Sequence, residues 1–142
     1  MERIKKFILV GSPISLARCR FSGNGHQAPH VFDTQKEIKL LSGLHLRKQM
    51  DEEKFAEGIP LEVNCVFYFD IPKSRQNCKN KKMLLIENDL QFGKPDVDNL
   101  IKFILDISNR IIYKDDAQVQ KVVAEKRYSK YPRTEFIVKT LK

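Results

Sequence analysis

The chain reads Leu61-Glu62-Val63-Asn64-Cys65-Val66-Phe67-Tyr68-Phe69 near its midpoint, and this is its most regular stretch. Every second side chain is apolar, so one face of an extended segment would be almost entirely hydrophobic. A period of two is typical of a β-strand with one buried face. We therefore expect a strand over residues 61–69 that organises a sheet around it.

The sequence before this strand predicts further elements. Residues 4–10 read as a strand that Gly11-Ser12-Pro13 ends, and residues 18–21 resume extended structure. Thr34-Gln35-Lys36-Glu37 fits a capping box, in which the Thr34 and Glu37 side chains bind backbone N–H groups at a helix start. A first helix is therefore expected from Thr34 to about Glu57, weakened at Gly43 by roughly 1 kcal/mol relative to alanine.

The sequence after the strand predicts a second helix and two more strands. Residues 70–93 contain Pro72, Gly93, several asparagines and five cations, which is typical of a long exposed connection. From Asp96 onward, apolar residues recur at the spacing of a helix face, at Val97, Leu100, Ile101, Ile104 and Leu105. Phe103 and Ile107 form a smaller apolar surface that is compatible with cover by a partner chain. Strands are expected over residues 119–128 and 134–141.

This order of strand, helix, strand, helix, strand, strand predicts an α+β fold in which a mixed sheet packs with two helices. The 142 residues, 42% of them hydrophobic, suit one domain spanning residues 1–142. Apolar runs are far shorter than the roughly 20 residues that cross a bilayer. Cys19, Cys65 and Cys78 are odd in number, so we expect no disulfide and a cytoplasmic chain that begins at Met1.

The charge balance indicates an anionic partner. Lys and Arg number 26 against 18 Asp and Glu, a formal net charge of +8. Such an excess of cations favours binding to phosphates, but charge alone does not separate DNA, RNA and acidic membrane. The sequence contains no Walker-type Gly-Lys-Ser/Thr loop, so we expect no nucleotide cofactor.

Four carboxylates gather in two pairs, Asp96 with Asp98 and Asp115 with Asp116. Mutual repulsion opposes such clusters unless a hard cation lies among them, and Mg²⁺ prefers oxygen ligands of this kind. If the strand from residue 119 pairs beside the strand ending at Phe69, Asp116 can return to the start of the second helix. The alternative is that these acids only cap a helix and a turn. Lys102, likewise, is either a cation beside the metal or an ordinary helical partner of Asp98 worth about 0.3 kcal/mol.

Two segments resemble the RusA-type Holliday junction resolvases (crossover junction endodeoxyribonucleases), a family that bacteriophages also carry. The family has Asp-x-Asp-Asn-Leu-x-Lys at a helix start and, one helix later, an aromatic residue followed by Asp-Asp-x-Gln. The chain reads Asp96-Val97-Asp98-Asn99-Leu100-Ile101-Lys102 and Tyr113-Lys114-Asp115-Asp116-Ala117-Gln118 at these places. More weakly, Gly11-Ser12-Pro13 and Arg18-Cys19-Arg20 resemble the family's Gly-x-Pro and Arg-x-Arg segments. The specific match spans residues 94–128.

The resemblance implies an endodeoxyribonuclease that depends on Mg²⁺ or Mn²⁺ and resolves four-way DNA junctions by paired, symmetric nicks as a homodimer. It implies metal-binding and catalytic roles for Asp96, Asp98 and Asp116, with Asp115 nearby as a further ligand and Lys102 as an essential catalytic cation. One departure stands out. Some members carry a run of arginines before the first Asp, where this chain has Phe92-Gly93-Lys94-Pro95.

Cations elsewhere are candidates for phosphate contacts. The residues expected to bind DNA are Arg18, Arg20, Lys73, Arg75, Lys94 and Lys114. For the loop cations, a solvated loop is an equally good reading. A nuclease of the PD-(D/E)xK class is disfavoured, because Glu125-Lys126-Arg127 lacks a lysine two residues after the acid. The remaining alternative is a non-catalytic basic module that binds DNA or RNA and uses its carboxylates only as caps.

Overall fold

The computed structural model describes residues 2–23, 25 and 30–141. The strands are β1 (Ile4–Val10), β2 (Arg20–Ser22), β3 (His30–Phe32), β4 (Leu61–Asp70), β5 (Val119–Ser129) and β6 (Arg133–Thr140). The helices are α1 (Lys36–Gln49) and α2 (Val97–Ser108), with short 3-10 turns η1 (Lys73–Arg75) and η2 (Asp116–Gln118). Among the described residues, neither helix is long and apolar enough to span a membrane.

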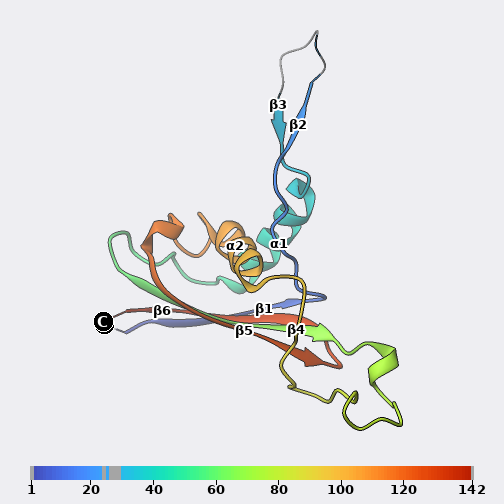
Figure 1. Cartoon of the computed structure of the whole chain (residues 1–142). Coiled ribbons are helices and arrows are strands. Elements are labelled where there is room, and N and C mark those ends of the chain that lie inside the picture. Colours follow the sequence, from blue (N-terminus) through green and yellow to red (C-terminus); the bar gives the residue numbers. More distant parts are fainter. Residues whose placement is uncertain (1, 24, 26–29, 142) are drawn as a thin grey trace.

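Four strands form one mixed sheet in the order β1-β6-β4-β5. Strand β6 runs antiparallel to β1 and β4, whereas β4 and β5 are parallel and are joined by a crossover that contains α2. Both helices lie on the same side of the sheet (Figure 1). The predicted α+β fold, with a mixed sheet and two helices, is confirmed.

Strand β4 has partners on both sides, and its alternation reflects burial on the helix-covered face. Leu61, Val63, Cys65 and Phe67 are at most 2% exposed. The rings of Phe7 on β1 and Phe136 on β6 stack with their centroids 5.1 Å apart, which extends this core across the sheet. The strands expected over residues 4–10, 119–128 and 134–141 form as β1, β5 and β6.

Strands β2 and β3 form a separate two-stranded hairpin that projects away from the sheet (Figure 1). The extended structure expected over residues 18–21 is therefore realised only from Arg20 onward.

Helix α2 buries both of its apolar faces within this chain. Phe103 and Ile107 are 1% and 5% exposed, so this chain itself covers the smaller apolar surface, and a partner chain is not needed for it. Helix α1 packs against α2, and Phe103 also lines a groove between α1 and β1. The sequence revealed both apolar faces of the helix but not that α1 would cover the second.

Helix α1 starts at Lys36 with Gln35 as its N-cap, and no side-chain capping bond forms, so the predicted Thr34–Glu37 capping box is wrong. Longer-range contacts decide this start. The Gln35 amide accepts a hydrogen bond from the Ala17 N–H at 2.8 Å and donates to the Ser15 carbonyl at 2.9 Å.

The same helix ends at Gln49, well before the expected Glu57. Beyond it, Asp51 pairs with Lys5 on β1, and the Phe55 N–H donates to the Ile112 carbonyl at 2.9 Å while its ring is buried. These tertiary contacts hold the segment in a non-helical path. Gly43, which weakens the helix locally, is explained by packing, because a Cβ there would lie 3.2 Å from Ile111 Cδ1.

Candidate active site

The start of α2 presents three charged side chains to solvent. Asp96 is the N-cap residue, but its side chain makes no capping bond and lies 3.1 Å from the Lys94 ammonium instead. Asp98 follows in the first turn, and its carboxylate is 3.9 Å from the Lys102 ammonium. The side chains of Asp96, Asp98 and Lys102 are 53%, 65% and 60% exposed. The capping alternative therefore does not account for Asp96.

Strand β5 fixes the loop that leads into this helix. Leu90 forms an antiparallel bridge with Arg127, and the Gln91 N–H donates to the Lys126 carbonyl at 2.9 Å. The Lys126 ammonium donates to the carbonyls of Gly93 at 2.5 Å and Pro95 at 2.8 Å. The approach to Asp96 is thus held by the sheet on which α2 packs.

A second segment reaches the same helix end. The Leu16 N–H donates to the Asn99 carbonyl at 3.0 Å, which places residues 14–17 against the first turn of α2. Arg18 follows two residues later and is exposed. This predicted DNA-binding residue therefore follows a segment whose backbone is hydrogen-bonded to the first turn of α2. The backbone of Arg20 belongs to β2, and its side chain lies outside the described part of the structure.

The second carboxylate pair sits on η2, which packs against α2. The Asp115 carboxylate accepts from the Ala117 N–H at 3.1 Å, and this bond, followed by one to Asp116, lowers the pKa of Asp115. The hydrogen bond with Asp115 raises the pKa of Asp116, and partial burial and the charges of Asp115 and Asp106 act in the same direction. For Asp115 the turn-capping interpretation is correct.

Asp106 is a neighbour of the site that lies outside both sequence motifs. It follows Asp98 and Lys102 at four-residue spacing on α2, which was the available sequence signal. The Lys39 ammonium lies 2.9 Å from the Asp106 carboxylate and 2.6 Å from that of Asp33. Burial lowers the pKa of Lys39, but the two hydrogen-bonded carboxylates outweigh it and the net shift is upward.

Within the described ranges, no three Asp, Glu, His or Cys side chains gather as a metal cluster. The predicted ligands form two groups, Asp96 with Asp98 and Asp115 with Asp116. Strand β5 does pair beside β4, as the sequence argument supposed, and the two strands run parallel. Apart from Asp115, the charge that raises the pKa of Asp116 is that of Asp106. The donor chemistry still fits Mg²⁺, because this ion commonly takes one or two carboxylates and completes its shell with waters and substrate phosphate.

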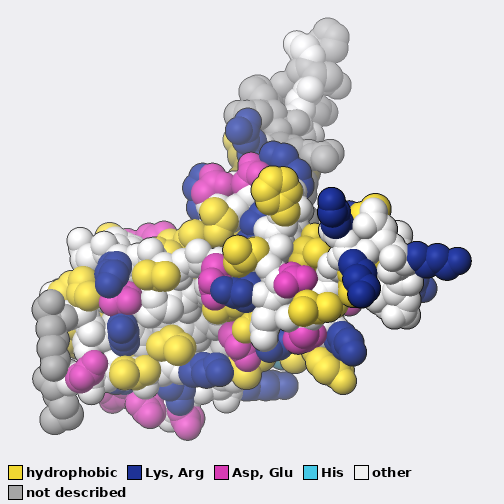
Figure 2. Space-filling model, turned by 60° about the horizontal axis from the view of Figure 1, so that its bottom comes forward, with side chains coloured by type: hydrophobic (Ala, Val, Ile, Leu, Met, Phe, Trp, Pro, Cys, Tyr) yellow, Lys and Arg dark blue, Asp and Glu magenta, His cyan; other side chains and the backbone are white. Residues whose placement is uncertain are grey.

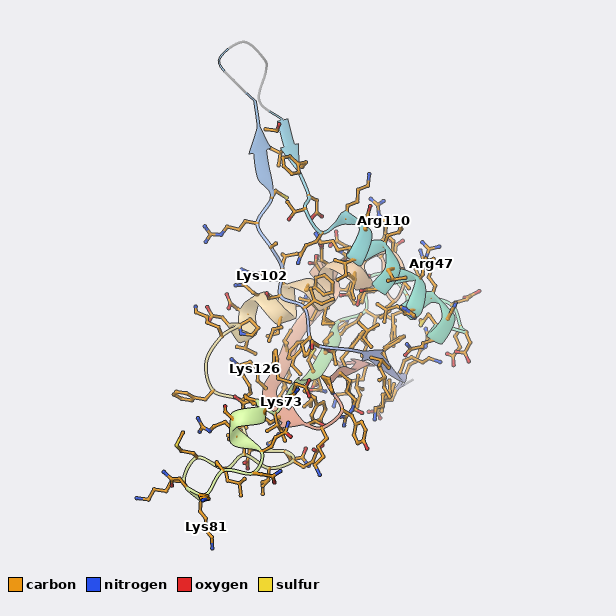
Figure 3. All side chains as sticks on the ribbon, turned by 90° about the vertical axis from the view of Figure 1, so that its right-hand side faces the viewer. Arg47, Lys73, Lys81, Lys102, Arg110 and Lys126 are labelled. Atoms are coloured by element: carbon orange, nitrogen blue, oxygen red, sulfur yellow. The ribbon has the colours of Figure 1, made fainter. Side chains whose placement is uncertain are left out.

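The predicted DNA-binding cations are distributed unevenly. Lys73 and Lys81 lie on a loop that projects below the sheet (Figure 3), and Lys and Arg side chains surround this projection (Figure 2). Arg75 is half-buried and its Nε donates to the Met83 carbonyl, so part of its guanidinium stabilises the loop. Lys94 and Lys114 are exposed but pair with Asp96 and Glu57, the latter at 3.0 Å.

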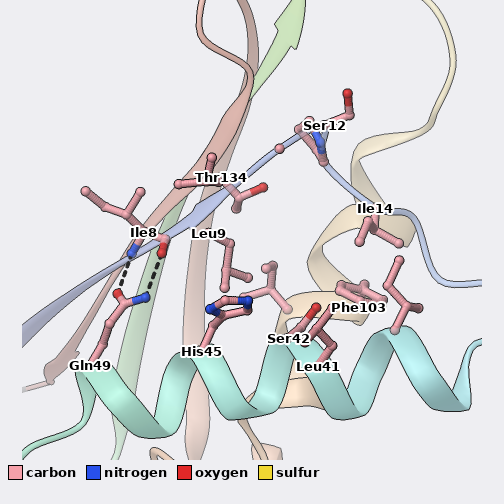
Figure 4. Close-up of a pocket in the computed structure, with 15 residues that line it drawn as sticks. Ile8, Leu9, Ser12, Ile14, Leu41, Ser42, His45, Gln49, Phe103 and Thr134 are labelled. Atoms are coloured by element: carbon pink, nitrogen blue, oxygen red, sulfur yellow. Dashed lines mark hydrogen bonds between the residues drawn. The ribbon is translucent and has the colours of Figure 1, made fainter.

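A separate groove of about 450 Å³ lies between α1 and β1 (Figure 4). Ile8, Leu41 and Phe103 contribute apolar walls, and the Gln49 side chain bridges the N–H and carbonyl of Ile8 at 2.9 and 2.7 Å. None of the predicted catalytic carboxylates lines this groove. Its apolar lining suits packing rather than hydrolysis.

Comparisons with known proteins agree with the motifs. The model of the endodeoxyribonuclease RusA family matches residues 11–139, which include both carboxylate segments and Lys102. The uncharacterized protein YqaN of Bacillus subtilis (strain 168) is 34% identical over 136 residues, covering 94% of each chain. With both motifs inside a match of this extent, the chain belongs to the RusA family of endodeoxyribonucleases.

Proposed function

We propose that the protein is a structure-specific endodeoxyribonuclease that resolves four-way DNA junctions by paired, symmetric nicks and requires Mg²⁺ or Mn²⁺. One observation carries the proposal beyond family membership. Asp96 stands exposed at a helix start without acting as a cap, beside Asp98 and Lys102. Solvent-facing carboxylates with a neighbouring cation, on a backbone fixed by β5, suit a phosphodiester that approaches from outside.

We assign the roles as follows. Asp96, Asp98 and Asp116, with Asp115 nearby, would hold the divalent ion. When bound, such an ion lowers the pKa of a coordinated water and withdraws charge from phosphate oxygens. Lys102 would oppose the negative charge that grows on the phosphate. The Ala117 N–H keeps the Asp115 carboxylate ionised and oriented, because the hydrogen bond lowers its pKa.

Exposed cations near this site would hold the DNA arms through phosphates. Arg18 lies two residues beyond Leu16, whose N–H binds the first turn of α2, and Lys73 belongs to the projecting loop. Lys94 and Lys114 adjoin the two carboxylate groups, so DNA phosphates would compete with their present carboxylate partners. Arg20 and Arg75 complete the proposed set.

Paired nicks need two sites, so we propose that the chain acts as a homodimer. Because Phe103 and Ile107 are buried within the chain, the dimer interface must lie on another surface. Helix α1 exposes Leu40, Leu41 and Leu44 by 50–67%, beside the apolar groove along β1. A helix that is apolar on its outer side also needs cover, and a second copy would supply it. Light scattering on Leu41→Lys and on the exposed control Lys36→Glu tests this surface, since only the first should yield monomers.

The function is tested with a synthetic four-way junction and a linear duplex of the same arms, each incubated with Mg²⁺ or with a chelator. We expect symmetric paired nicks on the junction, in Mg²⁺ alone. Equal cutting of the junction and the duplex would show that the protein is not specific for junctions. Cutting in the presence of chelator would show that it does not require a metal ion.

The second candidate, a non-catalytic binding module, draws on the capping role of Asp115 on η2. It predicts junction or duplex binding without nicking under any metal condition. The same assay therefore separates the two functions.

A further inference from the structure

Phe92 is 96% exposed, the highest value among the large hydrophobic residues that the structure describes. Water around a whole aromatic ring is unfavourable, and a mobile loop would normally fold such a ring onto the nearest apolar surface. The position of Phe92 therefore needs an explanation in the backbone around it.

The residues on either side of Phe92 are fixed. The Gln91 N–H donates to the Lys126 carbonyl at 2.9 Å, and the Gln91 side-chain amide donates to the Lys94 carbonyl at 3.0 Å. On the other side, Lys126 Nζ donates to the Gly93 carbonyl, and Gly93 has a φ of +108°, which side-chain-bearing residues rarely adopt. The backbone turns at Gly93 and presents the ring outward. Its exposure is built into the loop.

The surroundings of the ring indicate what it contacts. Lys94 follows two residues later with its side chain 86% exposed, and Asp96 follows four residues later. Four residues span at most about 14 Å between Cα atoms, so Phe92 lies within a few nucleotides of a phosphodiester bound at Asp96. An exposed aromatic ring beside cations is the arrangement on which unpaired bases stack.

We propose that Phe92 stacks on an unpaired or end-exposed nucleobase of branched DNA, next to the strand to be cut. This inference rests on the proposed function and adds to it a residue that selects the substrate. In continuous duplex every base face is already covered by its neighbours. At a branch point the stack is interrupted, so a base face is accessible without the free energy of unstacking. Phe92 therefore favours branched over linear DNA.

The experiment uses the full chain, chelator in place of metal, and a four-way junction with 2-aminopurine at the branch point. We expect wild-type protein to change the 2-aminopurine fluorescence and Phe92→Ala not to change it. Junction affinity should fall about tenfold in Phe92→Ala, the loss of one stacked base, while duplex affinity stays the same. Phe92→Tyr should keep both properties. Tyr131→Ala is the matched control, because Tyr131 is also an exposed aromatic, at 76%, on another loop.

Three outcomes would overturn the inference. They are an unchanged junction affinity and fluorescence in Phe92→Ala, an equal loss on duplex and junction, or a change in oligomeric state by light scattering. The last would mean that the ring, with Leu90 at 65% exposure, packs against a second copy. An assay of Mg²⁺-dependent nicking separates a failure of the stacking proposal from a failure of the proposed nuclease function. A wild-type protein that nicks junctions while Phe92→Ala matches it in every assay retains the function and loses only the stacking role.

Discussion

The ammonium group of Lys126 lies 2.8 Å from the carbonyl oxygen of Pro95 and donates a hydrogen bond to it. Strand β5 thereby holds the residue directly before Asp96. By sequence Lys126 is one more cation of a basic chain. In the fold its charge is directed inward, to two carbonyls of the loop that enters the candidate active site.

Lys126→Met should slow nicking more than it weakens binding. Without the ammonium group, residues 93–95 lose two hydrogen bonds, and a shift of about 1 Å at a catalytic group can cost roughly a hundredfold in rate. We expect a fall of about tenfold to a hundredfold in the single-turnover nicking rate at saturating junction. The free energy of unfolding should fall by about 2 kcal/mol, because two hydrogen bonds are lost and each contributes about 1 kcal/mol net.

Lys130→Met is the control for charge, because Lys130 is exposed near the end of β5. It should leave the saturated nicking rate unchanged. If Lys126→Met instead weakens junction binding and nicks normally at saturation, Lys126 acts as a phosphate contact and the positioning role is wrong.

Asp98→Asn should abolish nicking while junction binding persists. The amide keeps the size of the side chain but removes a negative charge, which weakens a divalent ion's attachment and eases the approach of phosphate. Gel-shift binding in Ca²⁺ and nicking in Mg²⁺ measure the two effects. Asp70→Asn, at the exposed end of β4, is the matched control. Loss of binding together with nicking would contradict this role for Asp98.

Local patterns predicted the elements whose burial is periodic. Strand β4 and helix α2 formed where alternation and helical spacing indicated, because one-sided burial leaves that record in the sequence. No periodic pattern in the sequence marks the first and last residues of α1. Its start depends on the Gln35 amide binding residues 15 and 17, and the docking of Phe55 holds the segment beyond its end away from the helix. Contacts between distant segments overrode a good local capping motif.

The same distinction applies to the site. The motif residues at the start of α2 were identifiable because their types and spacing are fixed within a few positions. Asp106 was visible on the helix, but its effect on Asp116 depends on η2 packing against α2, which is a tertiary contact. Likewise, the exposure of Phe92 follows from hydrogen bonds to β5 that no local pattern encodes.

Asp116→Asn should raise the thermal stability of the metal-free protein at neutral pH. The folded-state pKa of Asp116 is raised, so its protonated form contributes stability below the ordinary carboxylate pKa of 3.8, and that contribution is lost as pH rises through the folded pKa. Asparagine removes the charge. The Tm difference should therefore be small at acidic pH and grow to about 2 °C at pH 7.

In Mg²⁺ the wild type should become more stable than Asp116→Asn, because the ion would stabilise the wild type through the proposed ligand Asp116, which the variant lacks. Thermal denaturation with and without Mg²⁺ measures both effects. An Asp116→Asn variant that gains as much from Mg²⁺ as the wild type would exclude Asp116 as a ligand.

The salt dependence of junction binding tests the proposed phosphate contacts. Each cation that neutralises a phosphate contributes about 0.9 to the slope of log affinity against log salt, so Arg18→Gln and Lys73→Gln should each lower the slope by about 0.9. Lys48→Gln, an exposed lysine in the last turn of α1, should leave it unchanged. The measurement is junction affinity in chelator over a series of salt concentrations. A nearly flat slope in the wild type would exclude an extensive phosphate interface, and equal changes in all three variants would mean that net charge, rather than these two positions, governs binding.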